Sequence, residues 1–338
     1  MVTIKDIAQK LNLAPSTISK ALNNAADIND DTKRLVYETA LKMGYKIKRQ
    51  KNNMGMSERR VCIMIDNMDY ENNEQFGYDL ILGFKNAAMT HNWDVDIIPM
   101  NLNALAPVAN NYDTYMLQHK YSGAFMIGFS MHNDYIRNLK KTQFPTVLFD
   151  NHITDNLKVG YVSTDCYEGI RLALRHLKKL GHRKIAFLNG TKNTMISYER
   201  INAFEQIMGE LNLPVYEELL ENGYYVPDCA KYHVPKFLRH GATAIVCASD
   251  LIASGVINEV TRHGLSVPED ISVIGFDDMP FSTRLSPPLT TIKQDRLSLG
   301  KSALVLLDGL INDIPISKMI LRAELIERSS TDVAKQKL

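Results

Sequence analysis

The chain has 338 residues, of which 45% are apolar and 23% charged, a composition typical of folded globular proteins and not of disordered ones. No apolar run reaches the roughly 18 residues of a membrane span, and no secretory signal core is present, so we expect a cytoplasmic protein without membrane partners. The net charge of +1 conceals an asymmetry, because residues 1–60 hold twelve Lys or Arg against six Asp or Glu. This basic start indicates a polyanionic partner.

The four cysteines are widely separated, with no C-x-x-C pair and no histidine at the spacing of a metal site. We therefore expect buried thiols, no metal and no cofactor. The motif GFDD at residues 275–278 offers two neighbouring carboxylates, but no nucleophile or metal motif accompanies them. The sequence therefore predicts that the protein is not an enzyme.

The first 45 residues predict three short helices around a small core. Apolar residues at helical spacing, followed by Asn12, predict a first helix over 4–11. Pro15 is suited to the first turn of a second helix, because its missing N–H would have no partner within the helix. Asn29 or Asp30 can cap a third helix, which Gly44 ends. Residues 46–60, which are basic, polar and nearly free of core formers, are predicted to be a linker.

Beyond residue 60, apolar strand-like runs alternate with helical stretches, which predicts βαβ units and mostly parallel sheets. The strands are expected at 61–66, 94–100, 123–128, 145–150, 184–190, 244–249 and 271–277. The helices are expected near 75–90, 131–141, 166–180, 198–211, 230–239, 251–263 and 295–309. This length exceeds one comfortable core, so we expect two lobes.

Polar side chains stand at the carboxyl ends of these strands, where open α/β sheets bind their ligands. They are Asp66, Asp150, Ser249 with Asp250, and Asp277 with Asp278. A cleft between two lobes would therefore be rich in carboxylate oxygens.

Six stretches resemble, in one order along the chain, the LacI/GalR family of bacterial transcriptional regulators. They are TIKDIAQKLNLAPSTISKALNN from residue 3, TKRLVYETALKMGY from 32, STDCYEGIRLALRHLKKLGHRKIAFLNG from 163, SYERINAF from 197, VPEDISVIGFDDMPFSTRLSPPLTTIKQD from 267 and LIERSS from 325. The resemblance runs over about residues 2–330. It implies an α/β protein with a helix-turn-helix head at 1–45, a hinge at 46–60 and a periplasmic-binding-protein-like body at 61–330 with parallel sheets.

In such a body the N-terminal lobe would comprise about 61–160 and 290–320, and the C-terminal lobe about 161–289 and 321–330. The resemblance implies a homodimer that binds palindromic double-stranded operator DNA and responds to a small-molecule effector, most simply a sugar. The chain ends at Leu338 without an apolar heptad tail, so we expect a dimer and not a tetramer.

The resemblance assigns two kinds of DNA contact to the head. The base-reading positions of the family are occupied by Pro15, Ser16 and Lys20, and Lys20 is able to donate to guanine O6 or N7. The phosphate-contacting positions are occupied by Thr3, Thr17, Ser19, Asn23 and Thr32.

The hinge departs from the family pattern. Many relatives carry Tyr-x-Pro-Asn before a short helix whose leucine wedges into the minor groove, whereas here Tyr45 is followed by Lys46, Ile47 and Lys48. Met54 falls near the wedge position, but the Asn and Gly residues around it are poor helix formers. Attraction of DNA phosphates by the basic residues needs no such helix.

The resemblance places four residues on the effector, namely Asp150, Arg200, Ser249 and Asp277. Carboxylates accept pairs of sugar hydroxyls, and a guanidinium supplies two parallel donors. Phe76 and Tyr225 are expected to stack on the ligand. Gln294 corresponds to a cleft residue of the family or makes a structural bond at a lobe crossover, and Asp278 caps a turn or faces the cleft.

These motifs favour a repressor of a carbohydrate-use operon. A cytoplasmic carbohydrate-processing enzyme is the second hypothesis, against which the helix-turn-helix motif and the missing catalytic residues argue. An exported sugar-binding protein would need a signal peptide. The sequence leaves open whether the effector is a sugar, nucleoside, purine or sugar phosphate, whether it releases or strengthens DNA binding, and whether a phosphocarrier protein acts with it.

Overall fold

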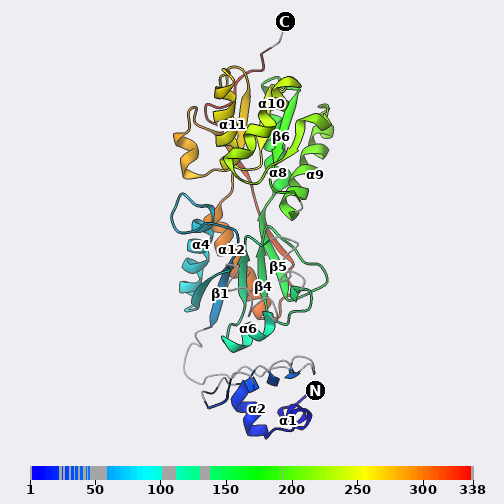
Figure 1. Cartoon of the computed structure of the whole chain (residues 1–338), viewed down its shortest axis with the longest axis vertical. Coiled ribbons are helices and arrows are strands. Elements are labelled where there is room, and N and C mark those ends of the chain that lie inside the picture. The colour runs from blue at the N-terminus through cyan, green and yellow to red at the C-terminus, as the bar shows by residue number, and fades with distance from the viewer. Residues whose placement is uncertain are drawn as a thin grey trace.

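The computed structural model describes residues 2–22, 59–100, 112–129, 138–192 and 194–335, together with scattered positions between 25 and 45. In chain order it contains a helical head and two lobes, each built on a six-stranded sheet (Figure 1). Most of the predicted linker, residues 46–58, lies outside the described residues.

The head begins with α1 (Ile4–Leu11) and α2 (Pro15–Leu22), both as predicted. The Thr3 hydroxyl accepts a hydrogen bond from the Asp6 backbone, and the Asp6 carboxylate accepts one from the Thr3 backbone at 2.7 Å, which closes a capping box. Asn29, one of the two predicted caps of the third helix, accepts a hydrogen bond from the Thr32 backbone at 2.7 Å. Apolar residues of these segments form a core of their own: Ile7, Ala8, Ile18, Ala21, Val36 and Ala40.

The N-terminal lobe contains a fully parallel sheet in the order β11-β5-β4-β3-β1-β2. Its strands are β1 (Arg60–Ile65), β2 (Asp94–Pro99), β3 (Ala124–Ile127), β4 (Thr146–Phe149), β5 (Val159–Thr164) and β11 (Lys318–Leu321). Its helices are α4 (Phe76–Thr90), α6 (Tyr112–Gln118) and α12 (Arg296–Ile311). Alternate residues of β1 point to opposite faces: Ile63 packs with α4 and α12, and Met64 packs with α6.

The C-terminal lobe contains a sheet in the order β12-β10-β9-β8-β6-β7, in which only β12 is antiparallel to its neighbour. Its strands are β6 (Ile185–Asn189), β7 (Leu220–Asn222), β8 (Ala244–Cys247), β9 (Ser272–Asp277), β10 (Thr290–Lys293) and β12 (Glu324–Ile326). Its α-helices are α8 (Cys166–Lys179), α9 (Met195–Glu210), α10 (Ala230–Arg239) and α11 (Asp250–Arg262), with short 3-10 helices η1 (Glu217–Leu219), η2 (Pro227–Cys229) and η3 (Pro280–Arg284).

Two helices of this lobe lie on opposite faces of its sheet. Gly169 of α8 lies against the ring of Phe276, whereas Gly275, the preceding residue of β9, lies against Asp250 of α11.

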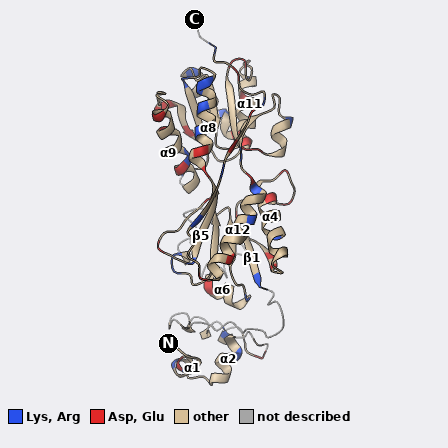
Figure 2. Ribbon diagram, turned by 180° about the vertical axis from the view of Figure 1, so that it is seen from behind, with Lys and Arg blue, Asp and Glu red and all other residues tan. Residues whose placement is uncertain are grey.

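The strands of both sheets are largely free of charged residues, which lie mostly on the helices and loops (Figure 2). The buried apolar residues of each lobe form a core that is separate from that of the other lobe.

The chain crosses between the lobes after β5, after β10 and after β11. The lobe boundaries expected from the sequence are therefore wrong by a few residues, because 161–164 complete β5 of the N-terminal lobe and 290–293 form β10 of the C-terminal lobe. Both strands carry small polar and β-branched residues without a long apolar run, and β10 has only four residues. Pairing with β4 and with β9 decides their place.

All seven predicted strands are present, as are six of the seven predicted helices of the body. The seventh, at 131–141, falls largely outside the described residues. The sequence analysis missed α6 and the short strands β5, β7, β10, β11 and β12. Within the described part of the chain, no helix combines the length and apolarity needed to span a bilayer, and all four cysteines are buried, as expected.

Candidate functional site

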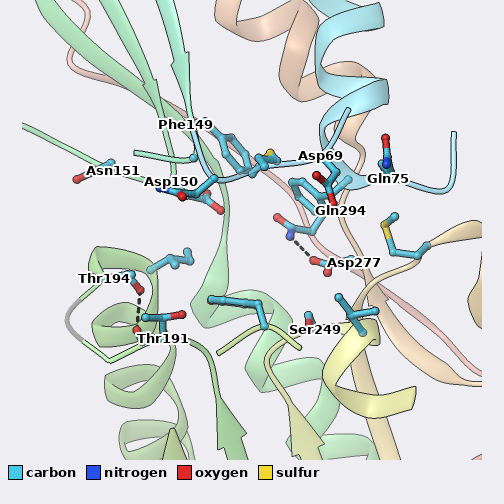
Figure 3. A pocket seen from close by; sticks show the side chains of 18 of the residues that line it. Asp69, Gln75, Phe149, Asp150, Asn151, Thr191, Thr194, Ser249, Asp277 and Gln294 are labelled. Carbon is cyan, nitrogen blue, oxygen red and sulfur yellow. Dashed lines mark hydrogen bonds between the residues drawn. The ribbon is translucent and has the colours of Figure 1, made fainter. Parts of the chain in front are cut away.

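A cavity of about 640 Å³ lies between the two lobes, at the carboxyl ends of their strands. All seven residues that the sequence analysis placed on an effector line it: Phe76, Asp150, Arg200, Tyr225, Ser249, Asp277 and Gln294. Figure 3 shows Asp150 and Gln294 on one side of the cavity and Thr194 and Ser249 on the other. The crossing of the chain between the lobes thus brings together side chains that are more than 200 residues apart.

Arg200 of α9 is the only cationic side chain among the described lining residues, and it is almost fully buried. Its Nη1 donates to the carbonyl of Ala248 at 2.6 Å and lies 3.5 Å from the hydroxyl of Tyr225. Its guanidinium lies 4.2 Å from the centre of the Phe276 ring. The Nε of Arg200 is buried without a hydrogen-bond partner within the described structure, and Arg200 as a whole lines the cavity.

Asp277 ends β9 with a φ of 122°, a backbone conformation that L-residues rarely adopt. The side chain of Gln294 donates to its Oδ1 at 2.7 Å (Figure 3). Arg296 donates to the carbonyl of Asp277 at 2.7 Å. Burial, and then the charge of Asp250, raises the pKa of the Asp277 carboxyl against the opposing influence of Arg200. Gln294 therefore fulfils both predicted roles, since it lines the cavity and also holds Asp277.

Asp150 follows β4 in a left-handed conformation with a φ of 50°. The hydroxyl of Ser163 donates to its Oδ1 at 2.6 Å. Burial raises the pKa of Asp150 to about 6, although the positive charge of Arg200 and the Ser163 hydrogen bond both lower it. Asp150 and Asp277 thus offer acceptor oxygens from opposite lobes.

Two helices begin at the cavity with capped N-termini. The hydroxyl of Ser249 accepts from the backbone of Ile252 at the start of α11, and that of Thr194 accepts from the backbone of Ser197 at the start of α9. Because the hydroxyl oxygen of Ser249 already accepts this bond, the hydroxyl has fewer hydrogen bonds left to make with a ligand in the cavity.

Aromatic rings form the apolar walls. Phe76, at the start of α4, lies with its ring centre 5.8 Å from that of Phe149. The ring of Tyr225 fills the space beside Gly190, where any Cβ would collide with it. Such faces suit the apolar side of a sugar ring.

Three of the strand-end carboxylates do not line the cavity. Asp250 is buried beneath it and accepts from the backbone of Met279 at 2.7 Å and from the hydroxyl of Ser282 at 2.5 Å. Asp278 forms an ion pair with Arg328 at 2.5 Å, so it neither faces the cleft nor makes the expected turn cap. The expectation that these strand ends contribute their oxygens to a cleft is therefore wrong for Asp66, Asp250 and Asp278.

The sequence analysis missed several lining residues, most of them apolar or small. Phe149 and Asn151 flank Asp150, and Thr191 follows β6, so the strand-end rule applied to every strand would have found them. Apolar lining residues such as Met68, Leu251 of α11 and Phe281 of η3 carry no comparable signal.

The base-reading residues predicted on the head, Pro15, Ser16 and Lys20, are exposed along α2. The Nζ of Lys20 forms an ion pair with Asp27 at 2.5 Å. Thr3 takes part in the cap of α1. The predicted contacts Asn23, Lys48 and Met54 lie outside the described residues, whereas Thr17, Ser19, Thr32 and Tyr45 are described and half-buried.

Comparison with known proteins agrees with this architecture. A profile of the periplasmic binding protein-like domain matches residues 174–331. The chain is 28% identical to the probable HTH-type transcriptional repressor ExuR of Bacillus subtilis over 298 residues, 87% of each chain. Among solved structures it is similar to the transcriptional regulator CelR in complex with cellobiose, with a TM-score of 0.72, 20% identity and coverage of 98% and 100%.

It is also similar to the lac repressor dimer bound to operator and the anti-inducer ONPF, with a TM-score of 0.68, 22% identity and coverage of 98% and 99%. A two-lobed body with a cavity between its lobes, joined to a helix-turn-helix head, defines a ligand-responsive transcriptional regulator and not an enzyme. The chain is therefore similar to HTH-type transcriptional repressors and, in fold, to regulators of the LacI family.

Proposed function

We propose that the protein is a cytoplasmic repressor that binds a palindromic operator as a homodimer. Its affinity for this operator changes when an uncharged carbohydrate binds in the cavity. One observation carries the proposal: Asp150, Arg200 and Asp277, from three separate segments, converge on one cavity of a helix-turn-helix protein. Adjacent sugar hydroxyls match two carboxylate acceptors and a guanidinium donor, and the rings of Phe76 and Phe149 match the apolar face.

Charge favours a neutral sugar over a sugar phosphate. The described lining residues include the guanidinium of Arg200 and four carboxylates, Asp69, Glu74, Asp150 and Asp277, of which only Glu74 is paired with a further arginine, Arg284. A phosphate beside Arg200 would also face Asp150 and Asp277, and like charges in a partly buried cavity repel strongly. A neutral polyol avoids this cost and uses the same acceptors.

The head supports the DNA-binding part of the proposal. The exposed face of α2 presents Ser16 and Lys20, and the first 60 residues carry an excess of positive charge. The two-fold symmetry of a dimer requires two-fold related half-sites in the DNA.

Selection of bound sequences from a random duplex pool with the full-length protein tests the operator. We expect an enriched palindrome whose affinity falls steeply as salt is raised. Enrichment without two-fold symmetry, or no enrichment, would show that the operator assignment is wrong.

Thermal shift against matched pairs of neutral sugars and their phosphates tests the effector. At about 100 times its dissociation constant a ligand adds about 2.7 kcal/mol to the free energy of unfolding. We expect stabilisation by a neutral member and a weaker effect of its phosphate. The reverse order would contradict the proposed effector class.

A further inference from the structure

An ion pair joins the two lobes at the rim of the cavity. The Nη2 of Arg284, at the end of η3 in the C-terminal lobe, lies 2.7 Å from the Oε2 of Glu74, which precedes α4 in the N-terminal lobe. Glu74 itself lines the cavity. The pair is a contact between the lobes in addition to the three crossovers, because neither residue belongs to β5, β10 or β11 or to the segments that follow these strands.

The C-terminal partner is carried by a firmly held segment. The hydroxyl of Ser282 and the backbone of Met279 both donate to the buried Asp250 at the start of α11, and the backbone of Leu289 donates to the carbonyl of Ser282. These bonds tie the backbone that carries Arg284 to the body of the C-terminal lobe.

The N-terminal partner is also held by its own loop. The backbone of Glu74 donates to the side chain of Asn72 at 3.0 Å, and the side chain of Gln75 accepts from the backbone of Asn72 at 3.1 Å. The backbone of Gly77 donates to the carbonyl of Asp69 at 3.0 Å, which ties the loop to the start of α4.

The same two segments carry walls of the cavity. Gln75 and Phe76 follow Glu74 directly, and Met279 and Phe281 precede Arg284. The distance across which Glu74 and Arg284 meet is therefore linked to the separation of two cavity walls that a ligand would contact. From this juxtaposition we infer that Glu74 and Arg284 form a latch, a pair of positioning residues that sets the separation of the lobes and couples it to occupancy of the cavity.

Thiol cross-linking of the full-length protein tests whether the segments that carry Glu74 and Arg284 lie close together in solution. All four native cysteines are buried, so a Glu74→Cys, Arg284→Cys double variant presents only its two new thiols to a short bismaleimide. We expect rapid cross-linking within the chain. A Glu74→Cys, Arg262→Cys variant is the control and should not cross-link. Equal rates in the two variants would overturn the inference.

Charge reversal tests whether the latch positions the lobes. An exposed ion pair changes an equilibrium by up to about fivefold, and Arg284→Glu places two carboxylates opposite each other. We expect an increased radius of gyration by small-angle scattering in Arg284→Glu, and recovery in the Glu74→Arg, Arg284→Glu swap. Arg262→Glu is the matched control, because Arg262 is as exposed as Arg284, at 62% and 61%, but pairs with Glu259 of its own helix.

The functional readout rests on the proposed function. On the duplex obtained by selection, the affinity of Arg284→Glu should change by up to about fivefold, and the swap should restore it. Scattering and affinity that match the wild type in Arg284→Glu, or equal changes in Arg262→Glu, would overturn the latch. If no duplex is selected, the operator assignment fails, and cross-linking and scattering still decide the latch.

Discussion

Arg200 is the side chain on which we expect ligand recognition to depend most. It carries the only positive charge among the described residues that line the cavity, and removing a charge-assisted hydrogen bond costs about 1.5 to 3 kcal/mol. Arg200→Ala should therefore bind the sugar found by thermal shift about 10 to 150 times more weakly, as measured by calorimetry.

Arg200 also holds the carbonyl of Ala248, so its removal affects packing. Arg200→Lys keeps the charge and shortens the donor, and it serves as a second variant if Arg200→Ala unfolds. Circular dichroism checks folding in both. A folded Arg200→Lys protein that bound the sugar and released operator as the wild type does would remove Arg200 from the effector site.

The carboxyl of Asp150 is expected to make stability depend on pH. Its pKa rises from 3.8 to about 6 on folding because burial disfavours the charged form. The folded protein therefore binds this proton more tightly, so its contribution to stability is complete below about pH 4 and is lost as the pH rises through about 6.

Asp150→Asn keeps an acceptor for Ser163 and removes the titration. Relative to the wild type, its free energy of unfolding should rise between pH 4 and pH 7 by on the order of 1 to 2 kcal/mol, allowing for the partial exposure of the group. Urea denaturation at several pH values measures this. A difference between the two proteins that stays constant over this range would contradict the assignment.

At the scale of elements, the helix α9 carries Arg200 at the cavity, and Thr194 caps the N-terminus of this helix. Thr194→Ala removes the hydrogen bond to the Ser197 backbone and should lower the free energy of unfolding by about 1 kcal/mol. Thr194→Ser keeps the hydroxyl and should stay within a few tenths of the wild type. Equal losses in the two variants, measured by denaturant titration, would mean that the cap is unimportant.

The helix α2 is expected to read DNA bases through Lys20. Lys20→Ala should cost about 1 to 3 kcal/mol of operator affinity and relax preference mainly at one base position. Thr17→Ala, at an expected phosphate contact, should weaken all sequences alike. Binding measured against a set of single-base operator variants distinguishes the two effects, and identical profiles would reject Lys20 as a base reader.

The ion pair of Lys20 with Asp27 adds a second test of the same helix. If DNA binding draws Lys20 away from Asp27, then Asp27→Asn should raise affinity, because the lysine no longer has to leave a carboxylate. Unchanged or weaker binding in operator titrations would indicate that Lys20 keeps this partner on DNA.

At the scale of the whole molecule, the head and each lobe have separate cores. We therefore expect a protein that begins at Arg59 to fold, to keep its thermal shift with the sugar and to lose DNA binding. Calorimetry and an operator titration check both properties. Retention of specific DNA binding would place the DNA contacts outside the head.

The sequence by itself determined the class of each element with a strong periodic pattern. Asn12 and Pro15 marked the boundary between α1 and α2, and long apolar runs marked seven strands of the body. Position at a strand end or in a family motif identified five of the seven cavity residues, whereas Phe76 and Tyr225 were chosen as aromatic residues able to stack on a ligand. These signals are local, because periodicity, caps and strand ends depend on neighbours in the chain.

Only the tertiary structure decided the lobe boundaries, the partners of the strand-end carboxylates and the latch. β10 lacks an apolar run and takes its place through pairing with β9, and Asp278 faces Arg328 because the chain returns there 50 residues later. Glu74 and Arg284 are 210 residues apart and meet because two independently folded lobes are joined by three crossovers. Contacts between distant segments depend on how whole sheets and helices pack, and neither the period nor the composition of a local stretch records that.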